Sequence, residues 1–157
     1  MRLGFYQPDI PQNLGAAVRL AACFGVGLEI IEPCGFPLTD RGLRRTALDY
    51  GGADAVVRRD NWRDFRDWAR QEGRRVILFT TGAEVTLPSF RFEASDILLF
   101  GRESAGVPDD VRAEADARVM IPMAQGQRSL NVVTSAAIAL WEACRQTGSG
   151  PVGALGP

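Results

Sequence analysis

Short apolar runs alternate with longer amphipathic segments along the chain, which is the pattern of an α/β protein. The runs VILFTT (76–81) and DILLFG (96–101) are apolar throughout, as expected for strands of a parallel sheet covered on both faces. The predicted strands are the six apolar runs at residues 2–7, 28–31, 55–57, 76–81, 96–101 and 118–121. We therefore predict a single α/β domain with a mostly parallel sheet flanked by helices.

Helical periodicity and capping residues place the helices between these strands. The predicted helices are NLGAAVRLAACF, WRDFRDWARQEG, VPDDVRAEA and a long apolar helix from about Leu130 to Thr147. Asn13 is the expected N-cap of the first helix, Asp60 or Asn61 that of the second, and Pro108 the first residue of the third. The domain is expected to cover residues 1–148, and the Gly- and Pro-rich residues 149–157 to form a disordered tail.

Composition and charge narrow the classes of function. The chain has 157 residues, of which 46% are apolar, and a net charge of −1, which argues against broad non-specific nucleic-acid binding. No apolar run is long enough to span a membrane, and the N-terminus does not resemble a signal peptide, so a cytoplasmic protein is expected. Residues 41–75 are locally basic, with ten arginines against six acids; they could contact RNA or form intramolecular ion pairs.

The chemistry open to the chain is limited because it contains neither histidine nor lysine. A Ser-His-Asp triad, a Cys-His pair and a Schiff base are therefore all excluded. Cys23, Cys34 and Cys144 lack the spacing of a metal site and are predicted to be reduced, buried and apolar in role. The loop FGRESAGVP (100–108) is not a phosphate-binding loop, because Val and Pro replace the required Lys and Ser/Thr.

Polar residues collect in loops that follow strands, where ligands of open α/β sheets bind. These loops are YQPDIPQNLGAAVR (6–19), FGRESAGVP (100–108) and PMAQGQRSLN (122–131). The candidate reactive residues are Arg19, Glu103, Arg128, Ser129 and Asn131. Each has an ordinary structural explanation when it is considered alone, such as helix capping by Ser129 or Asn131.

Considered together, three motifs resemble those of the SPOUT-class RNA 2′-O-ribose methyltransferases of the SpoU/TrmH-like type. They are N-x-G-x-x-x-R from Asn13 to Arg19, L-L-F-G-x-E-x-x-G-V-P at 98–108 and I-P-M-x-x-x-x-R-S-L-N-V at 121–132. In addition, IIEPCGFPLTDRGLRRTALDY (30–50) resembles the tRNA wobble-position enzymes of the TrmL type. The resemblance covers nearly all of residues 2–147.

The resemblance implies a fold with a C-terminal deep trefoil knot, a homodimer, and S-adenosylmethionine (SAM) as co-substrate without a metal. It also implies methyl transfer to the ribose 2′-hydroxyl of nucleotide 34, a cytidine or modified uridine, in a tRNA anticodon stem-loop. Three alternatives stay open: another tRNA position or rRNA as the target, methylation of a base nitrogen, and a non-catalytic RNA-binding module.

The resemblance also assigns roles to residues of this chain. Those implied for SAM binding are Phe79, Gly101, Ile121, Ser129 and Leu130. Arg19 is expected to stabilise the developing alkoxide, with Glu103 and Asn131 as further catalytic residues; the general base stays open. Asn13 and Arg128 are expected to bind RNA. Arg41, Arg44 and Arg45 are expected to do so on different grounds, because in a helix they would lie together on one face of the basic segment. Replacing Gly101 by Val is expected to abolish SAM binding and to leave the fold intact.

Overall fold

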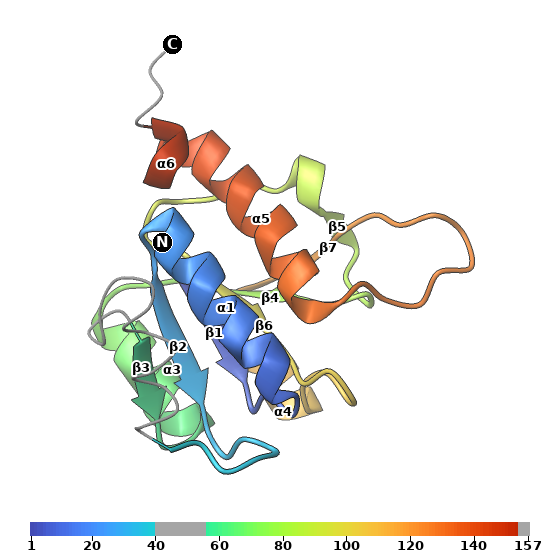
Figure 1. Ribbon diagram of the computed structural model, residues 1–157. Coiled ribbons are helices and arrows are strands. Elements are labelled where there is room, and N and C mark those ends of the chain that lie inside the picture. Colours follow the sequence, from blue (N-terminus) through green and yellow to red (C-terminus); the bar gives the residue numbers. More distant parts are fainter. Residues whose placement is uncertain (40–55, 154–157) are drawn as a thin grey trace.

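A single parallel sheet forms the centre of the protein (Figure 1). The computed structural model describes residues 1–39 and 56–153. Its seven strands have the order β3-β2-β1-β6-β4-β7-β5, and every neighbouring pair is parallel. The predicted α/β architecture with a mostly parallel sheet is therefore confirmed.

The six predicted strands are present within a few residues of their expected positions. The strands are β1 (Arg2–Tyr6), β2 (Gly27–Ile31), β3 (Val56–Arg59), β4 (Val76–Phe79), β5 (Val85–Thr86), β6 (Ile97–Phe100) and β7 (Ala117–Met120). The β5 strand was not among the predicted strands; it has only two residues and pairs with the end of β7. A strand of this length carries no periodicity that could have indicated it.

Helices cover both faces of the sheet (Figure 1). The elements outside the sheet are α1 (Pro11–Phe24), α3 (Trp62–Gln71), the short 3-10 helix η2 (Leu87–Ser89), α4 (Asp109–Glu114), α5 (Val132–Thr147) and α6 (Gly150–Gly153). The α1 and α5 helices pack on one face, in the same apolar cluster as Leu98 and Phe100 of β6. The α3 and α4 helices pack on the other, with Ile97 and Leu99 of the same strand. Alternating residues of one strand thus enter two cores, which explains its uniformly apolar sequence.

The observed helix starts correct three predictions of the sequence analysis. Helix α1 begins at Pro11 with Ile10 as its N-cap, so Asn13 lies in the first turn and is not the cap. Helix α5 begins at Val132, two residues later than predicted, with Asn131 as its N-cap. Pro108 is the N-cap of α4 and not its first residue. The N-cap of α3 is Asn61, whose side chain accepts a hydrogen bond from the Asp64 N–H at 3.0 Å.

The end of the chain and the cysteines also depart from expectation. Residues 150–153 form the short helix α6 where a disordered tail was predicted, and residues 154–157 lie outside the described part. Cys144 is buried, whereas Cys34 is partly exposed and Cys23 is exposed, so the prediction of buried thiols is wrong for Cys23. Burial raises the pKa of Cys34 to about 11, which keeps this thiol protonated. Within the described residues, no helix has the length and apolar character needed to cross a membrane.

Arginines of the basic segment that lie in the described part are largely paired with acids. The ion pairs are Arg58–Glu32, Arg59–Glu29, Arg63–Asp67, Arg66–Asp116, Arg70–Glu114 and Arg75–Asp96. For residues 58–75 the structure therefore supports the alternative of intramolecular ion pairs over a free basic surface.

Glu29 is the most enclosed member of this charge network. Its side chain is fully buried in β2, yet it accepts hydrogen bonds from Arg2 Nε and from Arg59 Nε, each at 2.7 Å. The Arg59 guanidinium also lies 4.0 Å from the centre of the Trp68 ring, a cation–π contact that ties β3 to α3. A buried carboxylate between two guanidiniums stabilises the fold only while all three charges are present.

We expect Glu29→Gln to lower the free energy of unfolding by about 3 kcal/mol, because two guanidiniums would lose their shared counter-charge. Urea unfolding monitored by circular dichroism measures the change. Glu84→Gln is the matched control, since Glu84 is exposed and should tolerate the same substitution. Equal stability of the two variants would contradict this role for Glu29.

Candidate active site

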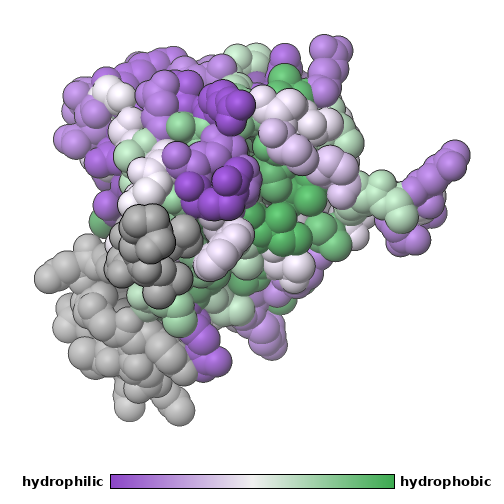
Figure 2. Space-filling view, turned by 90° about the horizontal axis from the view of Figure 1, so that it is seen from above, coloured by the Kyte–Doolittle hydropathy of each residue, from purple (hydrophilic) through white to green (hydrophobic). Residues whose placement is uncertain are grey.

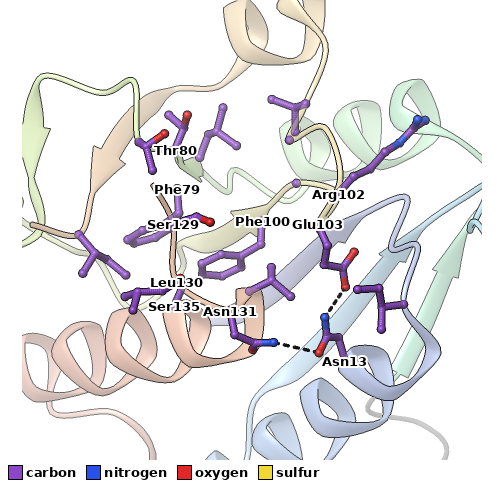
Figure 3. Close-up of a pocket in the computed structure, with 18 of the residues that line it drawn as sticks. Asn13, Phe79, Thr80, Phe100, Arg102, Glu103, Ser129, Leu130, Asn131 and Ser135 are labelled. Carbon is purple, nitrogen blue, oxygen red and sulfur yellow. Dashed lines mark hydrogen bonds between the residues drawn. The ribbon is translucent and has the colours of Figure 1, made fainter. Parts of the chain in front are cut away.

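A cavity of about 460 Å³ opens at the carboxyl ends of the central strands (Figure 3). Its walls come from the ends of β4 and β6, the start of α1 and the loop that connects β7 to α5. Its size falls in the range of small-molecule sites, and its position is where open parallel sheets bind ligands.

Eight of the residues selected from the sequence line this cavity. They are Asn13, Phe79, Gly101, Glu103, Ile121, Ser129, Leu130 and Asn131. Arg19 and Arg128 are exposed and do not line it. Arg41, Arg44 and Arg45 lie outside the described residues, so their assignment to RNA binding stays a prediction.

A chain of hydrogen bonds joins the three sequence motifs at the mouth of the cavity (Figure 3). Asn131 Nδ2 donates to Asn13 Oδ1 at 3.1 Å, and Asn13 Nδ2 donates to Glu103 Oε1 at 2.9 Å. These contacts connect residues that are 118 and 90 positions apart in the sequence. Asn13 is therefore the bridge between the second and third motifs.

The side chain of Asn131 is fixed at both ends. Its Oδ1 accepts hydrogen bonds from the N–H groups of Val133 and Thr134, at 2.9 and 3.2 Å, and so caps α5. Because the oxygen is used in this way, the Nδ2 group must point away from the helix, and it meets Asn13. The capping role and the site role expected for Asn131 are thus compatible.

Aromatic rings form an apolar floor beneath this polar mouth. The rings of Phe79 and Phe100, at the ends of β4 and β6, are stacked with centroids 5.0 Å apart. Ile121 and Leu130 add aliphatic walls from either end of the β7–α5 loop. A site with an apolar floor and few polar groups at its rim suits a ligand with a flat heterocycle and a charged end.

Gly101 lines the cavity and also packs closely against the loop that follows β6. A Cβ atom at this position would come within 2.5 Å of the Gly106 carbonyl carbon. The backbones of Arg102 and Gly106 exchange two hydrogen bonds of 2.9 Å, which close a tight loop, and Gly106 has a φ of +66°. This contact argues against the expectation that Gly101→Val leaves the fold intact, because the added side chain would collide with the backbone of this loop.

Several further residues that were not predicted as site residues also line the cavity. Besides residues adjacent to the motifs, they include Ile10, Arg102, Arg112, Met123 and Ser135. Ser135 follows Asn131 by four positions, a spacing that places both on one face of α5 and could have indicated it. The guanidinium of Arg102 lies 5.7 Å from the ring centre of Tyr6. Burial, opposed by Arg102, raises the pKa of Tyr6.

The loop between β7 and α5 projects from the body of the molecule (Figure 1). Residues 124–131 are all exposed, including Arg128. This exposed loop, which forms part of the cavity wall, therefore packs little against the rest of the protein. In the described part of the chain, no group of His, Cys, Asp and Glu residues is placed to hold a metal ion.

Comparisons with known proteins agree with the motifs. A family model described as the SpoU rRNA methylase family matches residues 1–141. A tRNA (cytidine(34)-2′-O)-methyltransferase of Beijerinckia indica is 52% identical over 147 residues, covering 94% of this chain and 92% of the relative. The protein of the same name from Escherichia coli (strain K12) is 34% identical over 150 residues, covering 94% of each chain.

Solved structures give the same result. A structure determined for the 2-OH methylation of C/U34 on tRNA superposes with a TM-score of 0.83 at 39% identity, covering 92% of this chain and 94% of that one. The SpoU methyltransferase AviRb of Streptomyces viridochromogenes, in complex with the cofactor AdoMet, gives a TM-score of 0.79 at 27% identity, covering 93% of this chain and 60% of that one.

We expect Gly101→Ala to lower the free energy of unfolding by about 1–3 kcal/mol, because its Cβ would collide with backbone. Gly15→Ala is the matched control: it lies inside α1 with no atom within 4 Å of an added Cβ. That substitution should stabilise the protein by about 0.5–1 kcal/mol. Thermal unfolding compares the two, and a neutral Gly101→Ala would contradict the steric explanation.

Proposed function

Since the chain belongs to the SpoU rRNA methylase family, we propose that it is a SAM-dependent tRNA methyltransferase acting on the ribose 2′-hydroxyl of nucleotide 34. The observation that carries the proposal is the hydrogen-bonded chain Asn131–Asn13–Glu103, which gathers all three motifs at the rim of one cavity. The proposed position of methylation rests on full-length relatives that carry this activity in their names.

The cavity residues fit SAM as the methyl donor. The stacked rings of Phe79 and Phe100 and the side chains of Ile121 and Leu130 provide apolar surface for an adenine. Backbone and side-chain polar groups of Ser129, Asn131 and Glu103 face the same space from the rim. Use of SAM by the family agrees with the AdoMet-bound AviRb structure.

SAM supplies a methyl group on a sulfonium, which is already a good leaving group. In the proposed reaction the ribose 2′-oxygen forms a bond to the methyl carbon, the carbon–sulfur bond breaks, and the hydroxyl proton is released. The products are the 2′-O-methylated RNA, S-adenosylhomocysteine and a proton. The protein then contributes mainly alignment of the hydroxyl with the methyl group, and alignment of this kind can supply much of a rate enhancement.

Among the described residues that line the cavity, Glu103 alone carries a carboxylate. It accepts hydrogen bonds from Asn13 Nδ2 and from the Asp9 N–H, at 2.9 and 3.1 Å. We assign it to orient Asn13 and, through it, Asn131, so that these carboxamides meet the ribose in a fixed geometry. The identity of the proton acceptor stays open in this proposal.

Arg19 and Arg128 are assigned to the electrostatics of RNA binding and of the developing alkoxide. Arg19 is six residues beyond Asn13 on α1, which places it about 120° away around the helix. Arg19 does not line the cavity of its own chain. To stabilise the alkoxide, its guanidinium must therefore meet the 2′-oxygen through the position of the bound RNA or across a contact with a second copy of the chain.

We also propose that the chain forms a homodimer through an apolar groove between η2 and α5, on the upper side of Figure 1. Its lining residues are Phe24, Leu87, Pro88, Ala137, Ile138, Trp141, Glu142 and Arg145. Trp141 is 50% exposed and Ile138 is 38% exposed, and hydrophobic residues gather on the face seen in Figure 2. Exposed apolar surface of this kind is typical of an interface. This interface would explain why α5 is apolar on several sides: one side packs on the sheet and α1, and another would pack on the second copy of the chain.

Two further expectations belong to this proposal. The C-terminal segment is proposed to be threaded into a trefoil knot, as the family resemblance implies. The cytoplasm, where tRNA is found, is the proposed location. The second candidate for the substrate is rRNA or another position of tRNA. The matching family model, which is described for rRNA methylases, supports this candidate.

We expect the purified protein to add one 2′-O-methyl group to nucleotide 34 of a tRNA in the presence of SAM. Mass spectrometry of the digested nucleosides measures the product. A tRNA with a 2′-deoxy nucleotide at position 34 is the control and should not be methylated. Asn131→Ala should reduce kcat because it removes the link to Asn13. Methylation of rRNA alone would support the second candidate instead.

We expect Trp141→Glu to convert the dimer into a monomer while it leaves the fold intact, because half of this side chain is already exposed within one chain. Sedimentation velocity at micromolar concentration measures the oligomeric state. Arg63→Glu on α3 is the control, since Arg63 is exposed on the opposite face of the sheet. A wild-type protein that sediments as a monomer would contradict the proposed dimer.

A further inference from the structure

Asp9 joins the loop after β1 to the loop after β6 by reciprocal hydrogen bonds. The Asp9 N–H donates to Glu103 Oε2 at 3.1 Å, while the Glu103 N–H donates to Asp9 Oδ1 at 3.2 Å. Ser104 donates to Asp9 Oδ2 from its N–H at 3.3 Å and from its hydroxyl. The carboxylate of Asp9 therefore fixes the backbone that carries Glu103, and the Asp9 N–H fixes the Glu103 side chain.

Asp9 is in turn held in place by Gly35. The Gly35 N–H donates to the Pro8 carbonyl oxygen at 2.9 Å. A Cβ on Gly35 would lie 2.7 Å from the Asp9 Cβ and 2.9 Å from the Asp9 Cα, so only glycine permits this approach. Gly35 belongs to the EPCGF stretch (32–36), which leads into the arginine-containing residues 41–45.

Asp9 does not line the cavity, whereas Glu103 does. The contacts form one series, in which Gly35 packs on Asp9, Asp9 binds the Glu103 loop, and Glu103 binds Asn13. A shift of Gly35 or Asp9 would therefore move Glu103 as well, because these groups are joined by contacts that are already formed.

On the basis of the function proposed above, we propose that Asp9 is a positioning residue that sets the orientation of Glu103 for methyl transfer, and that Gly35 holds Asp9 in the required place. The EPCGF stretch thereby contacts the loop that positions the Glu103 carboxylate. In the sequence, the same stretch precedes the arginines predicted to bind RNA.

The charge state of Asp9 suits this role. Its contact with the Glu103 side chain, followed by the hydrogen bonds from Ser104, lowers the pKa of Asp9 to about 2. Asp9 is therefore a carboxylate at neutral pH, where it accepts the hydrogen bonds from the Glu103 and Ser104 amides. A variant at Asp9 should change the rate without introducing a new pH dependence.

The test uses steady-state methylation of tRNA by the full-length protein, with SAM affinity measured by calorimetry. We expect Asp9→Ala to lower kcat about 10-fold or more, since misplacement of a catalytic group is costly even from a distance. The KM for tRNA and the affinity for SAM should stay at wild-type values. Gly35→Ala should change the same parameters in the same direction. Asp67→Ala is the control, because Asp67 is exposed on α3 and its ion pairs are with Arg63 and Arg70 of the same helix.

A double-mutant cycle distinguishes positioning from an independent effect. In a Glu103→Gln background, Asp9→Ala should add little further loss, because its effect passes through Glu103. An equal loss in both backgrounds would overturn the proposal, as would a raised KM for tRNA with unchanged kcat. Asp9→Asn, which keeps the size of the side chain, replaces Asp9→Ala if that variant does not fold.

Amide hydrogen exchange tests the same clamp without reference to activity. Asp9→Ala should accelerate exchange at the Glu103 and Ser104 amides, which lose their acceptor, and leave the strands of the sheet protected. Unchanged exchange there would overturn the inference. An inactive wild-type protein with the expected exchange would instead contradict the proposed function alone.

Discussion

The carboxamide of Asn13 is the contact on which the organisation of the site depends. Its oxygen accepts from Asn131 and its nitrogen donates to Glu103, so a single side chain satisfies groups from two other loops. An amide suits this position because it offers a donor and an acceptor side by side, whereas an aspartate would offer only acceptors. The loops after β1, β6 and β7 are thereby held in one arrangement, although each is connected covalently to a different strand.

The sheet determines which residues can meet in this way. Parallel strands β1, β6, β4 and β7 are neighbours in that order, so the loops at their carboxyl ends lie at one edge. The strands are nearly all apolar because helices cover both faces, and this leaves the loops as the place where polar side chains gather. Away from these loops, several charged side chains of the described residues form ion pairs: Glu29 with Arg2 and Arg59, and Asp116 with Arg66. A chain whose basic residues are all arginine therefore need not present a broadly basic surface.

Six of the seven strands and the eight cavity residues could be predicted from the sequence, for different reasons. Continuous apolar runs indicated the strands directly, whereas the cavity residues were found only through the spacing of three motifs. The errors have a common cause in contacts between distant residues. Asn13 has the sequence context of an N-cap, but Glu103, 90 positions away, decides where its side chain points. The close packing of Gly101 against Gly106, which bears on the expected effect of Gly101→Val, could not be foreseen without the fold. Arg102 and Arg112 follow no periodic pattern that would have indicated that they line the cavity.

The absence of histidine and lysine is consistent with the kind of site that the structure contains. Proton transfer from poorly activated groups usually calls for a side chain that titrates near neutral pH. A sulfonium methyl group does not need such activation of the leaving group, so the demand on the protein shifts toward orientation. The described side chains at the cavity rim serve orientation well: Asn13, Glu103 and Asn131 are joined to one another, and Asn131 is tied to α5 by its cap. These hydrogen bonds are complete within the chain itself, so the rim is ordered in advance and binding of a ligand there would cost little further ordering.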